Sequence, residues 1–269
     1  MGGAERNARK KRQAQLTQAK PVAAPARRQV DRKKVIIWAA VAVVVVGAAV
    51  GGYVYYDSQK NATEGQEIQA ASWGTPDPSY PVRREDAVVV VGEDTASVTL
   101  DVYEDFLCPA CRSFEEQYAG AVEEHIADGT LQVRYHMLPM LNDRSDPAGY
   151  SMDAANAGLC AADAGVFPEF HASLFEHQPD ENARGWDKQQ LTDLGTKQLD
   201  VTDPAFRACI ADGTHNTAVQ NHFDEVRETK HLEQDFDGQR GFGTPTLAAD
   251  EKVVKISDPK WLDNLLSAD

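Results

Sequence analysis

A run of 22 residues without a charge, Val35 to Tyr56, limits the ways in which this chain can fold. As a helix the run would be about 33 Å long, enough to cross the ~30 Å hydrocarbon core of a bilayer. Trp38 lies near one end and Tyr53 near the other, as in the aromatic belts of membrane helices. We therefore predict that residues 35–56 form a transmembrane anchor in contact with the lipid bilayer.

The charges on the two sides of this run differ in sign. The chain has 27 Lys and Arg against 42 Asp and Glu, a net charge of −15, yet residues 1–34 contain 11 Lys and Arg and only 2 acids. The positive-inside rule then predicts a basic cytoplasmic tail, residues 1–34, and places the rest of the chain outside the cell membrane. A basic tail can bind nucleic acid. Beside a membrane anchor, the basic tail is better explained as the segment that sets the membrane topology, and we expect no nucleic-acid partner.

The apolar run has two other interpretations. A cleaved signal peptide usually has a short basic region and an apolar stretch of ~7–15 residues. Here both regions are longer and no A-x-A cleavage site is evident, which favours an uncleaved, single-pass anchor. A buried core helix is less well supported, because such helices rarely lack polar residues on every face.

The exterior part begins with a polar stretch and continues as an α/β pattern. Residues 57–85 contain Pro76, Pro78 and Pro81, which is typical of a linker. From residue 86 onward β-rich runs alternate with amphipathic ones. The predicted elements are strands over 87–93 and 97–105, a helix from Pro109 to about Asp128, and a strand over 131–138.

A long helical stretch then interrupts this pattern. Residues 145–239 are mostly amphipathic or Ala-rich and predict several helices. Beyond them the sequence predicts two more strands and a closing helix, over 241–250, 252–257 and 258–268. Because the strands on both sides need partners in one sheet, we predict a single α/β domain, residues 86–144 and 240–269. The inserted helical domain is residues 145–239.

The motif Cys108-Pro109-Ala110-Cys111 lies where a predicted strand passes into a helix. Taken alone, two cysteines at this spacing could also be half of a zinc site or a chance occurrence. At a helix N-terminus, however, free N–H groups and the helix dipole favour an anion. The position therefore favours the thiolate of Cys108, the reactive form, while Cys111 lies one turn into the helix and is expected to be more buried.

A second signature, Gly243-Thr244-Pro245, precedes the strand Thr-Leu-Ala-Ala-Asp. A Pro that leads a strand beside a redox site suggests a cis peptide bond. Only ~5–6% of X–Pro bonds in folded proteins are cis, so the motif alone is weak. In combination with the paired cysteines it is much more specific.

These two motifs together give a family resemblance over roughly residues 87–269. The segments YEDFLCPAC (103–111) and FGTPT (242–246) resemble the DsbA family of thiol–disulfide oxidoreductases, in particular its membrane-anchored Gram-positive members. The resemblance implies a thioredoxin fold with an inserted helical domain. It also implies that Cys108 is the nucleophile, that Cys111 resolves the mixed disulfide and that Pro245 is cis. The backbone of Thr244 would pair with the substrate chain.

The resemblance also implies an activity and partners. It predicts that the protein introduces disulfides into unfolded exported proteins with free cysteines, and that a membrane reoxidase of DsbB or VKOR type regenerates it. No cofactor is expected beyond the redox-active Cys108–Cys111 disulfide. A reductase or isomerase on the same fold remains an alternative, as does a non-enzymatic client- or metal-binding module.

The sequence departs from the family at two positions. Ala110 stands where DsbA proteins often have His, so we expect a milder oxidant. Many thioredoxin-fold enzymes carry a buried acid six residues before the first cysteine, where this chain has Val102. Glu104 points to the same side of the strand by alternation, and it is either a substitute proton relay or merely exposed.

The remaining cysteines, Cys160 and Cys209, lie on apolar faces of predicted helices. Outside the membrane an even pair favours a structural disulfide. Two buried thiols or a second redox pair are the alternatives. The seven histidines show no zinc-binding spacing, and we predict no metal site.

Overall fold

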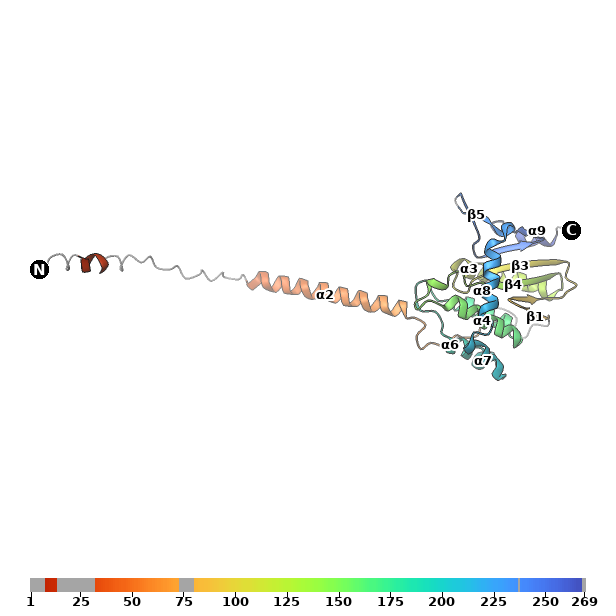
Figure 1. Ribbon diagram of the computed structural model, residues 1–269, viewed down its shortest axis with the longest axis horizontal. Coiled ribbons are helices and arrows are strands. Elements are labelled where there is room, and N and C mark those ends of the chain that lie inside the picture. The colour runs from red at the N-terminus through yellow and green to blue at the C-terminus, as the bar shows by residue number, and fades with distance from the viewer. Residues whose placement is uncertain (1–7, 14–31, 73–79, 237, 268–269) are drawn as a thin grey trace. The chain divides into compact units, whose positions relative to one another are not determined.

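The computed structural model describes residues 8–13, 32–72, 80–236 and 238–267 (Figure 1). It divides into two compact units, residues 1–54 and 55–269. Most of the predicted basic tail, at residues 1–7 and 14–31, lies outside the described residues.

The helix α2 (Arg32–Lys60) contains the whole apolar run. Among the described residues it is the one helix long and apolar enough to cross a membrane. Its large side chains are exposed all round, with Val43 at 72% and Trp38 at 71%. Apolar side chains on every face of a helix need an apolar surrounding, so α2 is consistent with the predicted single-pass anchor.

The second unit is built on a mixed six-stranded sheet in the order β1-β2-β4-β3-β7-β8. Strands β3 and β4 are parallel, and every other neighbouring pair is antiparallel. The strands are β1 (Val82–Glu85), β2 (Val88–Val91), β3 (Val98–Glu104), β4 (Leu131–Met137), β7 (Thr246–Ala249) and β8 (Lys252–Val253).

The predicted linker thus differs from the structure at its end, because β1 (82–85) belongs to the sheet. A turn at Asp86, with φ +53°, joins β1 to β2. The sequence Val-Arg-Arg-Glu has one apolar residue and gives no strand signal of its own. It forms a strand because it pairs with the neighbouring apolar strand β2, which is buried along its whole length.

Side chains along β3 alternate between two cores, as the pleat of a strand requires. Leu100 and Val102 join the main core, in which Phe114 and Ile126 of helix α3 (Pro109–Ala127) are buried. Tyr103 faces a smaller cluster with Val226 of helix α8 (Asn216–Glu228). The closing helix α9 (Trp261–Leu266) is shorter than predicted, beginning after a turn capped by Asp258. With the main core on one face and the smaller cluster on the other, the sheet is covered on both faces. This packing fixes the direction of α3.

In the sequence, the inserted helices follow β4 and precede β7, and Figure 1 labels α4, α6, α7 and α8 among them. Besides α8 they are α4 (Tyr150–Asp163), α5 (Phe167–Glu176), α6 (Lys188–Asp193) and α7 (Pro204–Asp212), with shorter turns η1 (Asn142–Arg144), η2 (Leu194–Gln198) and η3 (Lys230–Leu232). A small hairpin, β5 (Gln234–Phe236) with β6 (Gln239–Gly241), ends this part. Strands of three residues are too short for a period-2 pattern, so the sequence did not indicate them.

Cys160 of α4 and Cys209 of α7 form a disulfide with an S–S distance of 1.98 Å. The bond joins two helices through cysteines that are 49 residues apart in sequence. Cys160 is 1% exposed, and α4 is almost entirely buried. The disulfide therefore connects the outer helix α7 to the centre of the insertion.

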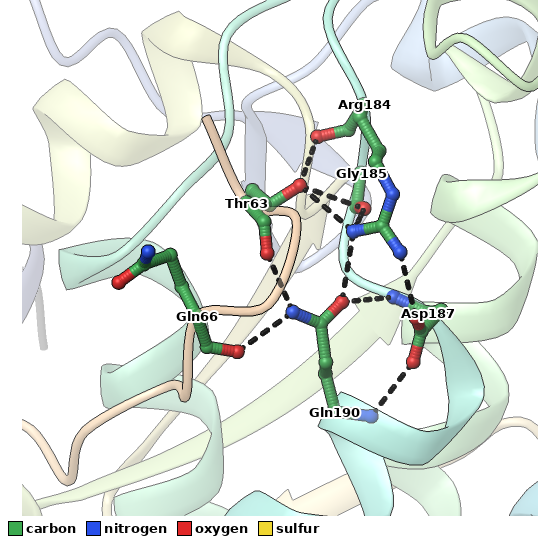
Figure 2. A network of polar contacts seen from close by, with 6 residues as sticks. All are labelled: Thr63, Gln66, Arg184, Gly185, Asp187 and Gln190. Atoms are coloured by element: carbon green, nitrogen blue, oxygen red, sulfur yellow. Dashed lines mark hydrogen bonds and ion pairs between the residues drawn. The ribbon is translucent and has the colours of Figure 1, made fainter. Parts of the chain in front are cut away.

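Residues 61–72, the docked segment, bind to the insertion although they fall in the predicted linker. Gln190 Nε2 donates to the carbonyl oxygens of Thr63 at 2.6 Å and Gln66 at 2.8 Å, as Figure 2 shows. Thr63 Oγ1 donates to Arg184 O at 2.9 Å. Ile68 is 1% exposed and belongs to the main core. The compact second unit therefore includes this segment.

Replacing Ile68 by Ala is expected to lower the free energy of unfolding by about 3 kcal/mol, because it removes a buried branched side chain and leaves a cavity. Denaturant unfolding of the full chain in detergent micelles measures the loss. The matched control is Gln69→Ala at the exposed neighbouring position, which should change stability by less than about 0.5 kcal/mol. Equal effects of the two substitutions would contradict the docking of this segment.

Candidate active site

Cys108 is the N-cap residue of α3, with Pro109 in the first turn of the helix. A Pro there suits the fixed backbone angle and needs no N–H partner. Cys108 is 6% exposed, and its Sγ lies 3.3 Å from Thr244 O. Gln178 Nε2 donates to Cys108 O at 3.0 Å. The loop before the helix is thus held by the insertion on one side and by the Thr244 loop on the other.

The two active-site thiols differ in protonation. A hydrogen bond from the Cys111 thiol, with further ones from the backbone N–H groups of Cys111 and Ala110, lowers the pKa of Cys108 to about 6. Burial raises the pKa of Cys111 well above its ordinary value, and Cys108 and Glu104 raise it further. Cys108 is therefore a thiolate at neutral pH and Cys111 a thiol. Both are free of disulfides in this structure.

Alkylation of Cys108 by iodoacetamide is expected to follow a titration with a midpoint near pH 6. An ordinary thiol titrates about two pH units or more higher. The rate of modification of the reduced protein as a function of pH measures the midpoint, with mass spectrometry to assign the site. A midpoint above pH 8 would contradict a stabilised thiolate.

The peptide bond between Thr244 and Pro245 is cis. Thr244 is the residue whose carbonyl oxygen faces Cys108, and its Oγ1 lies 3.8 Å from Met140 Sδ. The following strand β7 pairs with β3, so the loop is carried by the sheet that also carries the cysteine motif. The two sequence motifs, 136 residues apart, thus meet at one thiol.

Glu104 is fully buried at the end of β3, so the alternative that it is merely exposed is wrong. Its Oε2 lies 3.1 Å from His171 Nε2, and its side chain is hydrogen-bonded to that of Glu115. Burial raises the pKa of both carboxyl groups well above the ordinary range. The sequence analysis missed Glu115 and His171. Glu115 could have been found, because it lies one helical turn after Cys111.

Asp105 is a further residue that the sequence did not indicate. Its carboxylate accepts hydrogen bonds from Leu107 N at 2.7 Å, Leu141 N at 2.6 Å and Ser151 Oγ at 2.7 Å. Burial nevertheless raises its pKa to about 6. These bonds tie the cysteine loop to α4 and to the loop after β4, so the Asp105 side chain positions the site, while its backbone is hydrogen-bonded to Cys111.

Among the described residues, two groups bring possible metal-ligand atoms within 4.8 Å of one another. One consists of Cys160, Cys209 and His215, but its two sulfur atoms are joined in the disulfide. The other is Glu104, Glu115 and His171. The sequence spacing predicted neither group, because each joins residues from segments that are distant in the chain.

Comparison with known proteins identifies the family. The model of the thioredoxin family matches residues 84–268. The MdbA thiol–disulfide oxidoreductase of Corynebacterium matruchotii is 26% identical, with a TM-score of 0.56 over 67% of this chain and 88% of its own. Oxidised DsbA of Mycobacterium tuberculosis is also 26% identical, with a TM-score of 0.54 over 70% of this chain and 90% of its own.

Two curated relatives match about two thirds of the chain. The serine/threonine-protein kinase PknE of Mycobacterium tuberculosis is 32% identical over 183 residues, 66% of this chain. The match spans about a third of the kinase, 31% of its length, so the activity of the kinase is not transferred. Disulfide bond formation protein D of Bacillus subtilis is 24% identical over 62% of this chain and 69% of its own length. The family match shows that the chain belongs to the thioredoxin family, and its paired cysteines and cis-Pro loop accompany a similarity to DsbA-like thiol–disulfide oxidoreductases.

Proposed function

We propose that the protein introduces disulfide bonds into exported proteins through Cys108 and Cys111. The observation that carries this proposal is the contrast between the two thiols. Cys108 has a pKa near 6, whereas Cys111 is fully buried and stays protonated. A stabilised thiolate favours the reduced enzyme, and an enzyme with a stable reduced form donates its disulfide readily.

The reaction begins with the oxidised enzyme, in which Cys108 and Cys111 are joined. A client thiolate attacks Cys108 Sγ, the Cys108–Cys111 bond breaks, and Cys111 leaves as a thiolate that takes up a proton. A second client thiolate then attacks the client sulfur of the mixed disulfide and releases Cys108 as the stabilised thiolate. The client loses two electrons and the enzyme gains them.

Thr244 supports binding of the client backbone. Its carbonyl oxygen lies 3.3 Å from Cys108 Sγ. Thr244 directly precedes the cis bond at Pro245, and β7 begins after that bond. A client strand beside this loop could pair with the Thr244 backbone, while its cysteine reaches Cys108. Pairing through the backbone is independent of client sequence, which suits an enzyme that oxidises many proteins.

Glu104 is proposed as the group that gives the proton to the Cys111 thiolate. It is buried next to the cysteine pair, and it interacts electrostatically with both Cys108 and Cys111. Burial raises its pKa well above the ordinary range, which favours the protonated form that a proton donor needs. Thiol protonation thereby takes place without water at Cys111.

Continuous turnover needs a partner that removes two electrons from the reduced enzyme. We propose a membrane reoxidase of DsbB or VKOR type, because the helix α2 would hold this enzyme at the same membrane. The excess of Lys and Arg in residues 1–34 supports a cytoplasmic N-terminus and an extracytoplasmic catalytic unit.

The reduction potential of the Cys108–Cys111 pair tests the direction of the reaction. The full chain in detergent micelles is equilibrated in glutathione buffers, and the reduced fraction is followed by alkylation. We expect a value well above about −270 mV, the potential of thioredoxin, and toward about −120 mV. A value near or below about −270 mV would instead assign a reductase that needs electrons from across the membrane.

A further inference from the structure

The disulfide between Cys160 and Cys209 lies in the wall of a cavity of about 420 Å³. The cavity is lined by residues of α4, of α7 and of the loop that joins α7 to α8. Cys160 is 1% exposed, whereas Cys209 is half-buried and its neighbour Ala208 is exposed. Of the described residues that line the cavity, none belongs to the active-site cysteine motif or to the cis-Pro loop. A small molecule can therefore reach the disulfide from the side of Cys209.

His215 lies beside this disulfide, in the loop that joins α7 to α8. One of its ring nitrogens is within 4.8 Å of both sulfur atoms. Its Nε2 lies 3.0 Å from Asp163 Oδ2, and Arg84 Nε donates to Asp163 Oδ1 at 2.6 Å. The backbone of the loop is held as well, because His215 N donates to Asn156 Oδ1 at 2.8 Å. A histidine ring that is held by a carboxylate next to a sulfur atom can give a proton to a thiolate as it leaves.

The charged side chains around the cavity are mostly acidic. Asp203 and Asp212 line it in addition to Asp163, and all three are exposed. The basic side chains of the described wall are Arg84 and His215, and both are paired with Asp163. The wall therefore favours thiols that carry a positive charge or none over thiols that carry a negative charge.

We propose that Cys160 and Cys209 form a second site of thiol–disulfide exchange, at which small cationic or neutral thiols modify Cys209. The thiolate of the small molecule attacks Cys209 Sγ, the bond between the two cysteine sulfur atoms breaks, and Cys160 leaves as a thiolate. His215 gives a proton to this thiolate. Cys209 then carries the small molecule as a mixed disulfide. One disulfide replaces another, so the step needs no further oxidant or reductant.

The modification changes how α7 is attached to the insertion. The buried side chains of α7 are Phe206 and Ile210, and the disulfide is its covalent link to the buried helix α4. Exchange at Cys209 breaks this link and leaves the active-site cysteines unchanged. The second site thus goes beyond the proposed function, because it couples the stability of the insertion to the small thiols around the protein.

The test uses the full chain in detergent micelles with Cys108 and Cys111 both changed to Ser, which leaves the disulfide of the insertion as the one disulfide that four cysteines allow. The oxidised protein is treated with cysteamine, quenched with N-ethylmaleimide at low conversion and analysed by mass spectrometry of its peptides. We expect cysteamine on Cys209 and N-ethylmaleimide on Cys160. Cysteamine on Cys160, or no reaction of the folded protein, would overturn the proposal.

The part played by His215 is tested in the same protein. His215→Gln should slow the reaction at least about tenfold, since general acid catalysis typically contributes 10² or more. The rate per cysteamine thiolate should fall as the pH rises when His215 is present, because the ring loses the proton that it gives, and should not depend on pH in the variant. The matched control is His231→Gln, at an exposed position in η3. Equal rates and pH profiles for the two variants would contradict the role of His215.

Two further measurements separate a built site from a disulfide that reacts only when the protein unfolds. About 1 M urea should change the rate less than about twofold, whereas a reaction through global unfolding should become about fivefold faster or more, since urea lowers the free energy of unfolding in proportion to its concentration. Cysteamine should react faster per thiolate than 2-mercaptoethanesulfonate, and Asp212→Lys should narrow that difference. Acceleration by urea together with equal rates for the two thiols would overturn the proposal.

Discussion

Replacing Cys108 by Ser is expected to reduce disulfide transfer to the uncatalysed rate. Cys108 carries the only stabilised thiolate of the motif, because burial and Glu104 keep Cys111 protonated. A hydroxyl cannot form the mixed disulfide through which exchange proceeds. The measurement is oxidation of a reduced two-cysteine peptide by the oxidised enzyme, followed by mass spectrometry, with the wild-type chain beside it.

The matched variant, Cys111→Ser, is expected to behave differently. It retains the Cys108 thiolate, which should attack the disulfide of an oxidised two-cysteine peptide, bond to one peptide sulfur and release the other as a thiolate. The mixed disulfide should accumulate, since the resolving thiol is absent. Non-reducing electrophoresis detects the complex. Trapping by the Cys108→Ser protein instead would reverse the assigned roles, and full activity of the Cys108→Ser protein would favour a non-enzymatic client-binding module.

Removing the Cys160–Cys209 bond, with both residues changed to Ser, is expected to lower the free energy of unfolding by about 4 kcal/mol. The bond closes a loop with a sequence separation of 49 residues, and breaking it releases chain entropy in the unfolded state. Denaturant unfolding of the full chain, oxidised at both pairs, measures the difference. Changing both residues avoids an unpaired thiol that could attack the active site.

The same double variant should keep the Cys108 titration near pH 6 and most of the transfer rate at a temperature where it is folded. The bond joins α4 and α7, whereas Cys108 contacts Thr244 and Cys111. A variant that is as stable as the wild type yet inactive would contradict a structural role. It would show instead that electrons pass through this second pair.

The sequence predicted the parts of the site that depend on local structure. The position of Cys108 at the start of α3 follows from the strand-to-helix junction and Pro109. The buried face of α3 follows from helical spacing, and the cis bond before Pro245 was expected from its motif. These features are fixed by residues near one another in the chain, where periodicity and turn preferences apply.

Features that depend on contacts between distant segments were not predicted. His171 meets Glu104 across 67 residues, and no spacing rule connects a helix of the insertion with the end of β3. The docked segment resembles a linker in composition, and its binding is shown by contacts with distant residues, such as the burial of Ile68 and the hydrogen bonds of Gln190 and Arg184. A polar segment looks unstructured in the sequence when its backbone carbonyl groups are hydrogen-bonded by a side chain over 120 residues away.

The disulfide of the insertion has a consequence for how the enzyme is made. A newly made chain carries four thiols, and only one of the three ways to pair them joins Cys160 to Cys209 and Cys108 to Cys111. Maturation of each new copy therefore requires an oxidation event before the catalytic unit is complete. On the proposed function, an older copy can supply it, and the first client of the enzyme is then its own precursor.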